Sequence, residues 1–191
     1  MNTTTFLNHL QTSVNKLIAI TENEFKPLSL QQLNYKPGAD SWSILECLEH
    51  LNRYSRFYLP RLQEAISGAA PTKTDQNIAY SWLGKYSINF VKPGNGKKNK
   101  TLKHMNPNNS LLTSQVLEEF LRHQETVKAL LVKAQQKDLN KKTIAIEFMR
   151  FIKMKTGEAL EFLVLHQQRH IGQAQRVKAK LPQSSDAVLV M

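Results

Sequence analysis

The sequence contains a single cysteine, Cys47, so no internal disulfide can form and the chain suits a reducing compartment. It also lacks any apolar run close to the roughly 18–20 residues that a membrane-spanning helix needs. Its first residues, Met-Asn-Thr-Thr-Thr-Phe, have neither the basic segment nor the apolar core of a signal peptide. We therefore expect a cytoplasmic protein without a membrane anchor. Cys47 is expected to be a core residue rather than a nucleophile, because free cysteine is among the most buried residue types.

Acidic residues are scarce: 15 Asp and Glu face 26 Lys and Arg, which gives a net charge of +11. This excess keeps nucleic acid and anionic ligands among the possible partners. The lysines are dense only from Lys92 to Lys103, where proline and glycine residues indicate a loop. No helix-turn-helix, zinc-finger or RNA-binding pattern accompanies this segment, so a solvated loop is favoured over a phosphate-binding surface.

Hydrophobic periodicity predicts four long helices in one domain, because 191 residues with 41% hydrophobic content can bury one core but are few for two. The helices are expected at about 5–25, 43–67, 113–134 and 156–180, within a domain spanning 1–180 and followed by a flexible tail at 181–191. Residues 68–110 form a long connection between the second and third helices. Residues 144–154 form a connector that is either extended or helical.

Local signals refine two of these elements. Ser43 and Glu46 have the spacing of a capping box, which gives the second helix a defined start and assigns Glu46 a structural role. Thr156 is expected to cap the fourth helix. In the long connection, Ile78, Trp82, Tyr86 and Phe90 recur every four residues and predict a short amphipathic helix over one end of the bundle. The three aromatic side chains among them are predicted to fill the core, with a lid over a ligand as the alternative.

The fourth helix carries the most informative pattern. His166 and His170 lie four residues apart on the same face as Leu163 and Ala174, so both imidazoles are expected to point inward. A shared divalent metal would satisfy two buried imidazoles, and hydrogen bonds to neighbouring groups are the alternative. The sequence disfavours a zincin-type protease, because Gln167 occupies the position where that motif needs a glutamate as general base.

Two further histidines are candidates for a third ligand. His50 borders the apolar stripe of the second helix, so its side chain can face the interior of the bundle. His123 borders the apolar stripe of the third helix and is the alternative candidate for the third ligand.

The segments Trp42-Ser43-Ile44-Leu45-Glu46-Cys47-Leu48-Glu49-His50 and His166-Gln167-Gln168-Arg169-His170-Ile171-Gly172-Gln173 resemble the DinB-like (DinB/YfiT) superfamily of metal-binding bundles. The resemblance covers about residues 5–180. It implies an all-α fold, an up-down-down-up four-helix bundle with a long loop between helices 2 and 3. It also implies that His50, His166 and His170 hold one divalent metal, for which zinc or nickel is favoured over iron or cobalt.

The same resemblance implies a metal-dependent enzyme acting on a small molecule. Relatives of this kind include transferases that use low-molecular-weight thiols such as bacillithiol or mycothiol, and hydrolases have been suggested. Arg169 and the lysine-rich loop are candidates for holding the carboxylates of an anionic thiol, while no residue is assigned as general base. A homodimer, formed through the segment around Trp82, is a further expectation. The rival hypothesis is a non-catalytic basic bundle that binds a partner or nucleic acid.

Overall fold

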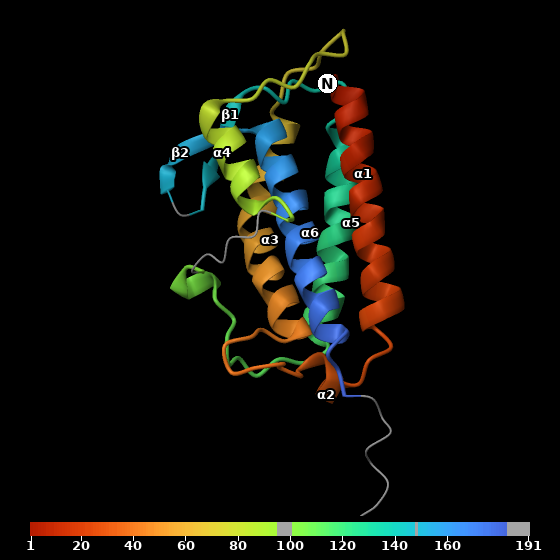
Figure 1. The fold of residues 1–191 in the computed structure, drawn as a ribbon. Coiled ribbons are helices and arrows are strands. Elements are labelled where there is room, and N and C mark those ends of the chain that lie inside the picture. The colour runs from red at the N-terminus through yellow and green to blue at the C-terminus, as the bar shows by residue number, and fades with distance from the viewer. Residues whose placement is uncertain (95–100, 148, 183–191) are drawn as a thin grey trace, which may run out of the picture.

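Four long helices form the bundle in the computed structural model, which describes residues 1–94, 101–147 and 149–182 (Figure 1). They are α1 (Thr3–Ile20), α3 (Ile44–Ser67), α5 (Gln115–Lys133) and α6 (Thr156–Lys178). In Figure 1, α1 and α6 run downwards while α3 and α5 run upwards, so the topology is up-down-down-up as expected. The π-helical turn η1 (Thr21–Phe25) extends α1, and the short α2 (Leu30–Leu33) precedes α3.

The long connection between α3 and α5 follows from their shared direction. Since the two helices are parallel, the chain must travel back along the bundle before α5 can begin. It does so through α4 (Trp82–Val91), which packs on α6, and the 3-10 turn η2 (Lys103–Met105) beside α3. The short helix predicted in this connection is therefore present. Part of the lysine-rich loop, residues 95–100, lies outside the described residues.

The connector before α6 is extended. Strands β1 (Lys142–Ile146) and β2 (Met149–Lys155) pair antiparallel and pack against α3, α4 and α6. Ile144, Ile146 and Met154 bury their side chains in the core beneath the hairpin. The alternation of Ile144 and Ile146 has the period of two that is typical of a half-buried strand, and it explains why this segment is not helical.

The helix starts match the sequence signals at α3 but not at α6. At α3 the capping box is confirmed: the Glu46 amide donates to Ser43 Oγ at 3.1 Å and the Ser43 amide donates to Glu46 Oε2 at 2.8 Å. At α6 the N-cap is Lys155, not Thr156. The carboxylate of Glu158 accepts the Lys155 amide at 2.8 Å, and the Thr156 hydroxyl pairs with that of Thr143 at 2.9 Å instead.

The aromatic side chains of α4 do not fill the core, so the packing prediction was wrong. Trp82, Tyr86 and Phe90 are 80%, 58% and 44% exposed and stack in a row along the outer face of the helix. The opposite face is buried and consists of Gly84, Ser87, Ile88 and Val91. Small residues on this face let α4 approach α6 closely, which leaves the larger rings in solvent.

The apolar core consists of two clusters, one containing Phe6, Leu62 and Leu163 and the other containing Phe25, Cys47 and Phe120. Cys47 is completely buried, as expected, and burial raises the pKa of its thiol. Of the helices described, none is long and apolar enough to cross a membrane. The predicted tail falls mostly outside the described residues, since 183–191 are not among them.

Candidate metal centre

Helices α3 and α6 bring three histidines together inside the bundle. His50 comes from α3, while His166 and His170 come from successive turns of α6. The Nε2 atoms of His50 and His166 are 3.2 Å apart, and one ring nitrogen from each of the three residues lies within 4.8 Å of the others. His50 and His166 are buried and His170 is half-buried. The three residues expected to form the site are therefore neighbours, although 116 positions separate His50 from His166.

Hydrogen bonds orient two of the rings. Nδ1 of His50 lies 2.8 Å from the Met105 carbonyl oxygen, and Nδ1 of His170 lies 3.0 Å from Oε1 of Gln173. Both partners are acceptors, so each Nδ1 carries the proton and each Nε2 keeps a lone pair. His166 Nδ1 is buried and has no hydrogen-bond partner within the described part of the chain.

This donor set fits a divalent metal ion. Imidazole nitrogens bind zinc at about 2.1 Å, so two ligands of a tetrahedral ion are about 3.4 Å apart. The 3.2 Å between His50 Nε2 and His166 Nε2 is already close to that spacing. The partners on the outer nitrogens of His50 and His170 are of the kind that orient metal-bound histidines in proteins.

All three imidazoles are neutral at physiological pH, as metal binding requires. Burial is the main cause in each case: the pKa of His50 falls to about 4, that of His170 to about 3, and that of His166 lies well below its ordinary value. Nearby arginines lower these pKa values further, Arg53 at His50 and Arg169 at the other two. At His50 the carboxylate of Glu49 opposes the effect of Arg53, so the positive local field acts mainly on His166 and His170.

Aromatic rings form the walls of the centre. The Trp42 ring lies 4.9 Å from His50 and 5.7 Å from His170, and the Tyr54 ring lies 4.4 Å from His166, measured between centroids. Burial raises the pKa of Tyr54 to about 12, so its hydroxyl stays protonated. Sequence reasoning did not assign Tyr54 to the site. Its position four residues after His50, one helical turn away, was the signal that could have placed it there.

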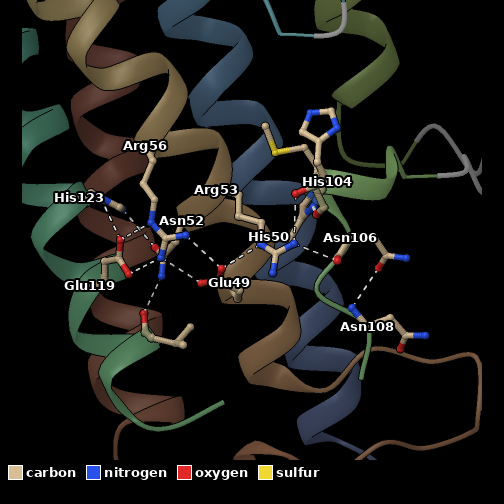
Figure 2. A network of polar contacts seen from close by, with 12 residues as sticks. Glu49, His50, Asn52, Arg53, Arg56, His104, Asn106, Asn108, Glu119 and His123 are labelled. Atoms are coloured by element: carbon tan, nitrogen blue, oxygen red, sulfur yellow. Dashed lines mark hydrogen bonds and ion pairs between the residues drawn. The ribbon is translucent and has the colours of Figure 1, made fainter. Parts of the chain in front are cut away.

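His123, the alternative candidate for the third ligand, is not part of the centre. Nδ1 of His123 lies 3.2 Å from Oδ1 of Asn52, and Nε2 lies 3.7 Å from Glu119, on the side of α3 that faces α5 (Figure 2). His123 is absent from the group of three described above. Glu46 caps α3, as expected.

A family model described as the DinB superfamily matches residues 15–174. The chain belongs to the DinB superfamily. It is 25% identical to the uncharacterized protein YuaE of Bacillus subtilis over 162 residues, which span 84% of this chain and 92% of YuaE. Its fold is similar to that of Bacillus subtilis YfiT, with a TM-score of 0.57 and 14% identity over 91% of this chain and 86% of that one. That structure is described as a probable metal-dependent hydrolase with an unusual four-helix bundle topology.

One buried carboxylate of this DinB-superfamily protein, that of Glu147, was not predicted from the sequence. Glu147 lies beside β1, and its Oε1 pairs with the ring of His104. The other oxygen, Oε2, is buried and has no hydrogen-bond partner among the described residues. The charge of Glu147 contributes, after burial, to raising the pKa of Tyr54, which places the carboxylate near the aromatic wall. No motif in the sequence distinguishes it from a surface glutamate.

Proposed function

We propose that this protein is a metal-dependent enzyme in which His50, His166 and His170 hold one divalent ion. The observation that carries the proposal is the convergence of three neutral imidazoles inside the bundle, with the Nε2 lone pairs of His50 and His170 on the side away from their Nδ1 hydrogen bonds. In the metal-free protein the lone pair of His50 accepts the Nε2 proton of His166 at 3.2 Å, a contact that a shared metal ion would replace. When bound, the ion would lower the pKa of a water or thiol ligand and so supply a nucleophile at neutral pH. Zinc and nickel are the ions that we expect first.

The local charge supports an anionic small molecule as substrate. Arg169 and Arg176 lower the pKa of triad histidines, so both lie close enough to contribute positive potential, whereas the charge of Arg53 is paired with that of Glu49. Arg169 also donates to the Phe90 carbonyl at 3.5 Å, which directs it along the α4 side of the centre. A carboxylate on the substrate would be attracted to this side, and the protonated Tyr54 hydroxyl can donate to a polar group on the other.

The resident side chains favour activation by the ion over activation by a side-chain nucleophile. Cys47 is buried in the core, and because burial raises the pKa of its thiol, it cannot supply a thiolate at neutral pH. We therefore propose hydrolysis, with water as nucleophile, as the leading reaction, in line with the description of YfiT. Transfer to a low-molecular-weight anionic thiol is the second candidate, and Arg169 favours it because its guanidinium could hold a carboxylate of the thiol.

The test compares metal-free protein with protein reconstituted with zinc or nickel. Each form is offered carboxylate-bearing esters and amides, and separately a low-molecular-weight thiol with an electrophile, while product formation and thiol loss are followed. We expect turnover only with metal, its loss in His166→Ala and its retention in His123→Ala. Turnover that is unchanged by chelation or by His166→Ala would contradict the proposal.

A non-catalytic basic bundle remains the rival function, and it makes a different prediction. Binding of nucleic acid by the basic surface would weaken steeply with added salt and would be the same for His166→Ala as for the unmodified protein.

A homodimer is also proposed, for which the exposed row of Trp82, Tyr86 and Phe90 offers an apolar surface. Light scattering on Trp82→Lys would show a shift from dimer towards monomer.

A further inference from the structure

We propose that Arg53 is a positioning residue for the metal centre: it holds the backbone on both sides of Met105 and so fixes the carbonyl that keeps the Nε2 lone pair of His50 available. The inference rests on the proposed metal centre and adds a residue that touches neither the ion nor the substrate. It concerns the network in Figure 2, which joins α3 to the η2 segment.

Arg53 makes three short contacts. Its Nε donates to Oε1 of Glu49 at 2.9 Å, which fixes the guanidinium against α3. Its Nη1 donates to the carbonyl oxygens of His104 at 3.1 Å and Asn106 at 3.0 Å. Since one nitrogen carries two hydrogens in a plane, it can satisfy both carbonyls at once, and a planar guanidinium fixes their positions more rigidly than an ammonium would.

The residue between those two carbonyls is Met105, whose own carbonyl accepts the Nδ1 proton of His50 at 2.8 Å. Met105 is buried, whereas His104 and Asn106 are exposed. Arg53 therefore donates hydrogen bonds to the backbone carbonyls immediately before and after the Met105 carbonyl, which sets the tautomer of His50. If that carbonyl moved away, the His50 tautomer with a proton on Nε2 would become competitive, and this tautomer carries its lone pair on Nδ1, the nitrogen on the Met105 side of the ring.

The other contacts of this segment do not replace Arg53. The His104 side chain pairs with Glu147, and the Asn109 amide donates to Oε1 of Glu46 at 2.7 Å, so these contacts hold one side chain and the downstream end of the segment. The amides of Met105 and Asn106 donate to the Leu102 and Lys103 carbonyls, but these hydrogen bonds lie within the segment and do not join it to α3. Removing Arg53 should therefore loosen the Met105 carbonyl relative to His50, while the segment and the buried Met105 side chain stay attached.

Arg56 provides a matched control. Like Arg53 it binds Glu49, at 3.1 and 3.2 Å, and it lies one helical turn further along α3. Its remaining contacts are with Glu119, at 2.7 and 2.6 Å, and not with the η2 segment. Substituting either arginine removes one positive charge and one partner of Glu49, but only the substitution of Arg53 removes the hydrogen bonds to the η2 backbone.

The experiment titrates zinc into the metal-free forms of the unmodified protein, Arg53→Met and Arg56→Met, with stability measured in parallel by urea denaturation. Loss of groups that orient a metal ligand lowers metal affinity by about 10- to 100-fold. We expect a loss of this size in Arg53→Met and a much smaller change in Arg56→Met. Equal affinities in the two variants would overturn the role of Arg53. If Arg53→Met fails to fold, Arg53→Lys replaces it and is read against Arg56→Lys in the same way.

A second readout does not depend on metal. Nitrogen NMR of the metal-free protein reports the tautomer of His50, and we expect the Nδ1-protonated form in the unmodified protein and Arg56→Met but a mixture in Arg53→Met. An unchanged tautomer in Arg53→Met would overturn the inference. Failure of the unmodified protein to bind zinc or nickel would instead contradict the proposed function, so the two failures are distinguishable.

Discussion

Replacing Gly84 with alanine tests how α4 is fixed to the bundle. Gly84 lies on the buried face of α4, against the carboxyl group of Glu158 on α6. An added Cβ would lie 2.5 Å from Oε2 of Glu158 and closer still to Cδ and Oε1, distances that require something to move. Glu158 is fully buried and accepts the backbone amides of Ser81 and Lys155, so its carboxylate is not a flexible end that can swing aside.

The expected cost follows from those two hydrogen bonds. Displacing the carboxylate loses up to two bonds to a charged group, each contributing about 1.5–3 kcal/mol. Alanine is favoured over glycine inside a helix by about 1 kcal/mol, which offsets part of the loss. We therefore expect Gly84→Ala to lower the free energy of unfolding by about 2–5 kcal/mol.

The measurement is urea denaturation followed by circular dichroism, with Gly172→Ala as the control. Gly172 also lies inside a helix, but a Cβ there would meet only Nη1 of Arg176, at 3.7 Å. We expect Gly172→Ala to raise the free energy of unfolding by up to about 1 kcal/mol. If Gly84→Ala is as stable as Gly172→Ala, the close approach of α4 to Glu158 does not constrain the fold and the reasoning is refuted.

Three further predictions concern burial and charge. The Cys47 thiol should resist a thiol reagent in the native protein and react once urea unfolds it; fast native labelling would contradict its burial. In the metal-free protein the pKa of His50 is about 4 and that of His170 about 3, below the unfolded value of about 6.5. The unfolded state thus binds more protons below pH 6.5, so the free energy of unfolding should fall as pH drops from about 6.5 to 4, less steeply in His170→Gln. Trp82→Ser, measured at a concentration that keeps the protein monomeric, should change this free energy by less than about 0.5 kcal/mol, because the ring is 80% exposed in the single chain; a large loss would show that the ring packs in the folded monomer.

The sequence was sufficient where a local rule determines the structure. The Ser43 and Glu46 spacing located the start of α3, and the spacing of His166 and His170 placed both on one face of α6. The approach of His50 to that pair is a tertiary feature, and only the resemblance to a family indicated it. Local rules cannot predict which distant segments will pack together, and His50 and His166 are 116 positions apart.

The failures have a physical explanation too. A spacing of four residues shows that Trp82 and Tyr86 share a helical face but does not show whether that face points inward. Gly84 and Ser87, on the opposite face of α4, were the available signal, since small residues permit close helix packing. The contact of Met105 with His50 could not be predicted, because it uses a backbone carbonyl in an irregular segment, and every residue carries the same carbonyl.

Metal analysis of protein purified without chelators tests the central claim most directly. We expect about one equivalent of a divalent metal in the unmodified protein and in His123→Ala, whose histidine lies outside the centre, and a large loss in His50→Ala and His166→Ala. An unmodified protein that carries no more metal than His166→Ala, and that takes up neither zinc nor nickel when these are supplied, would contradict the assignment of a metal centre.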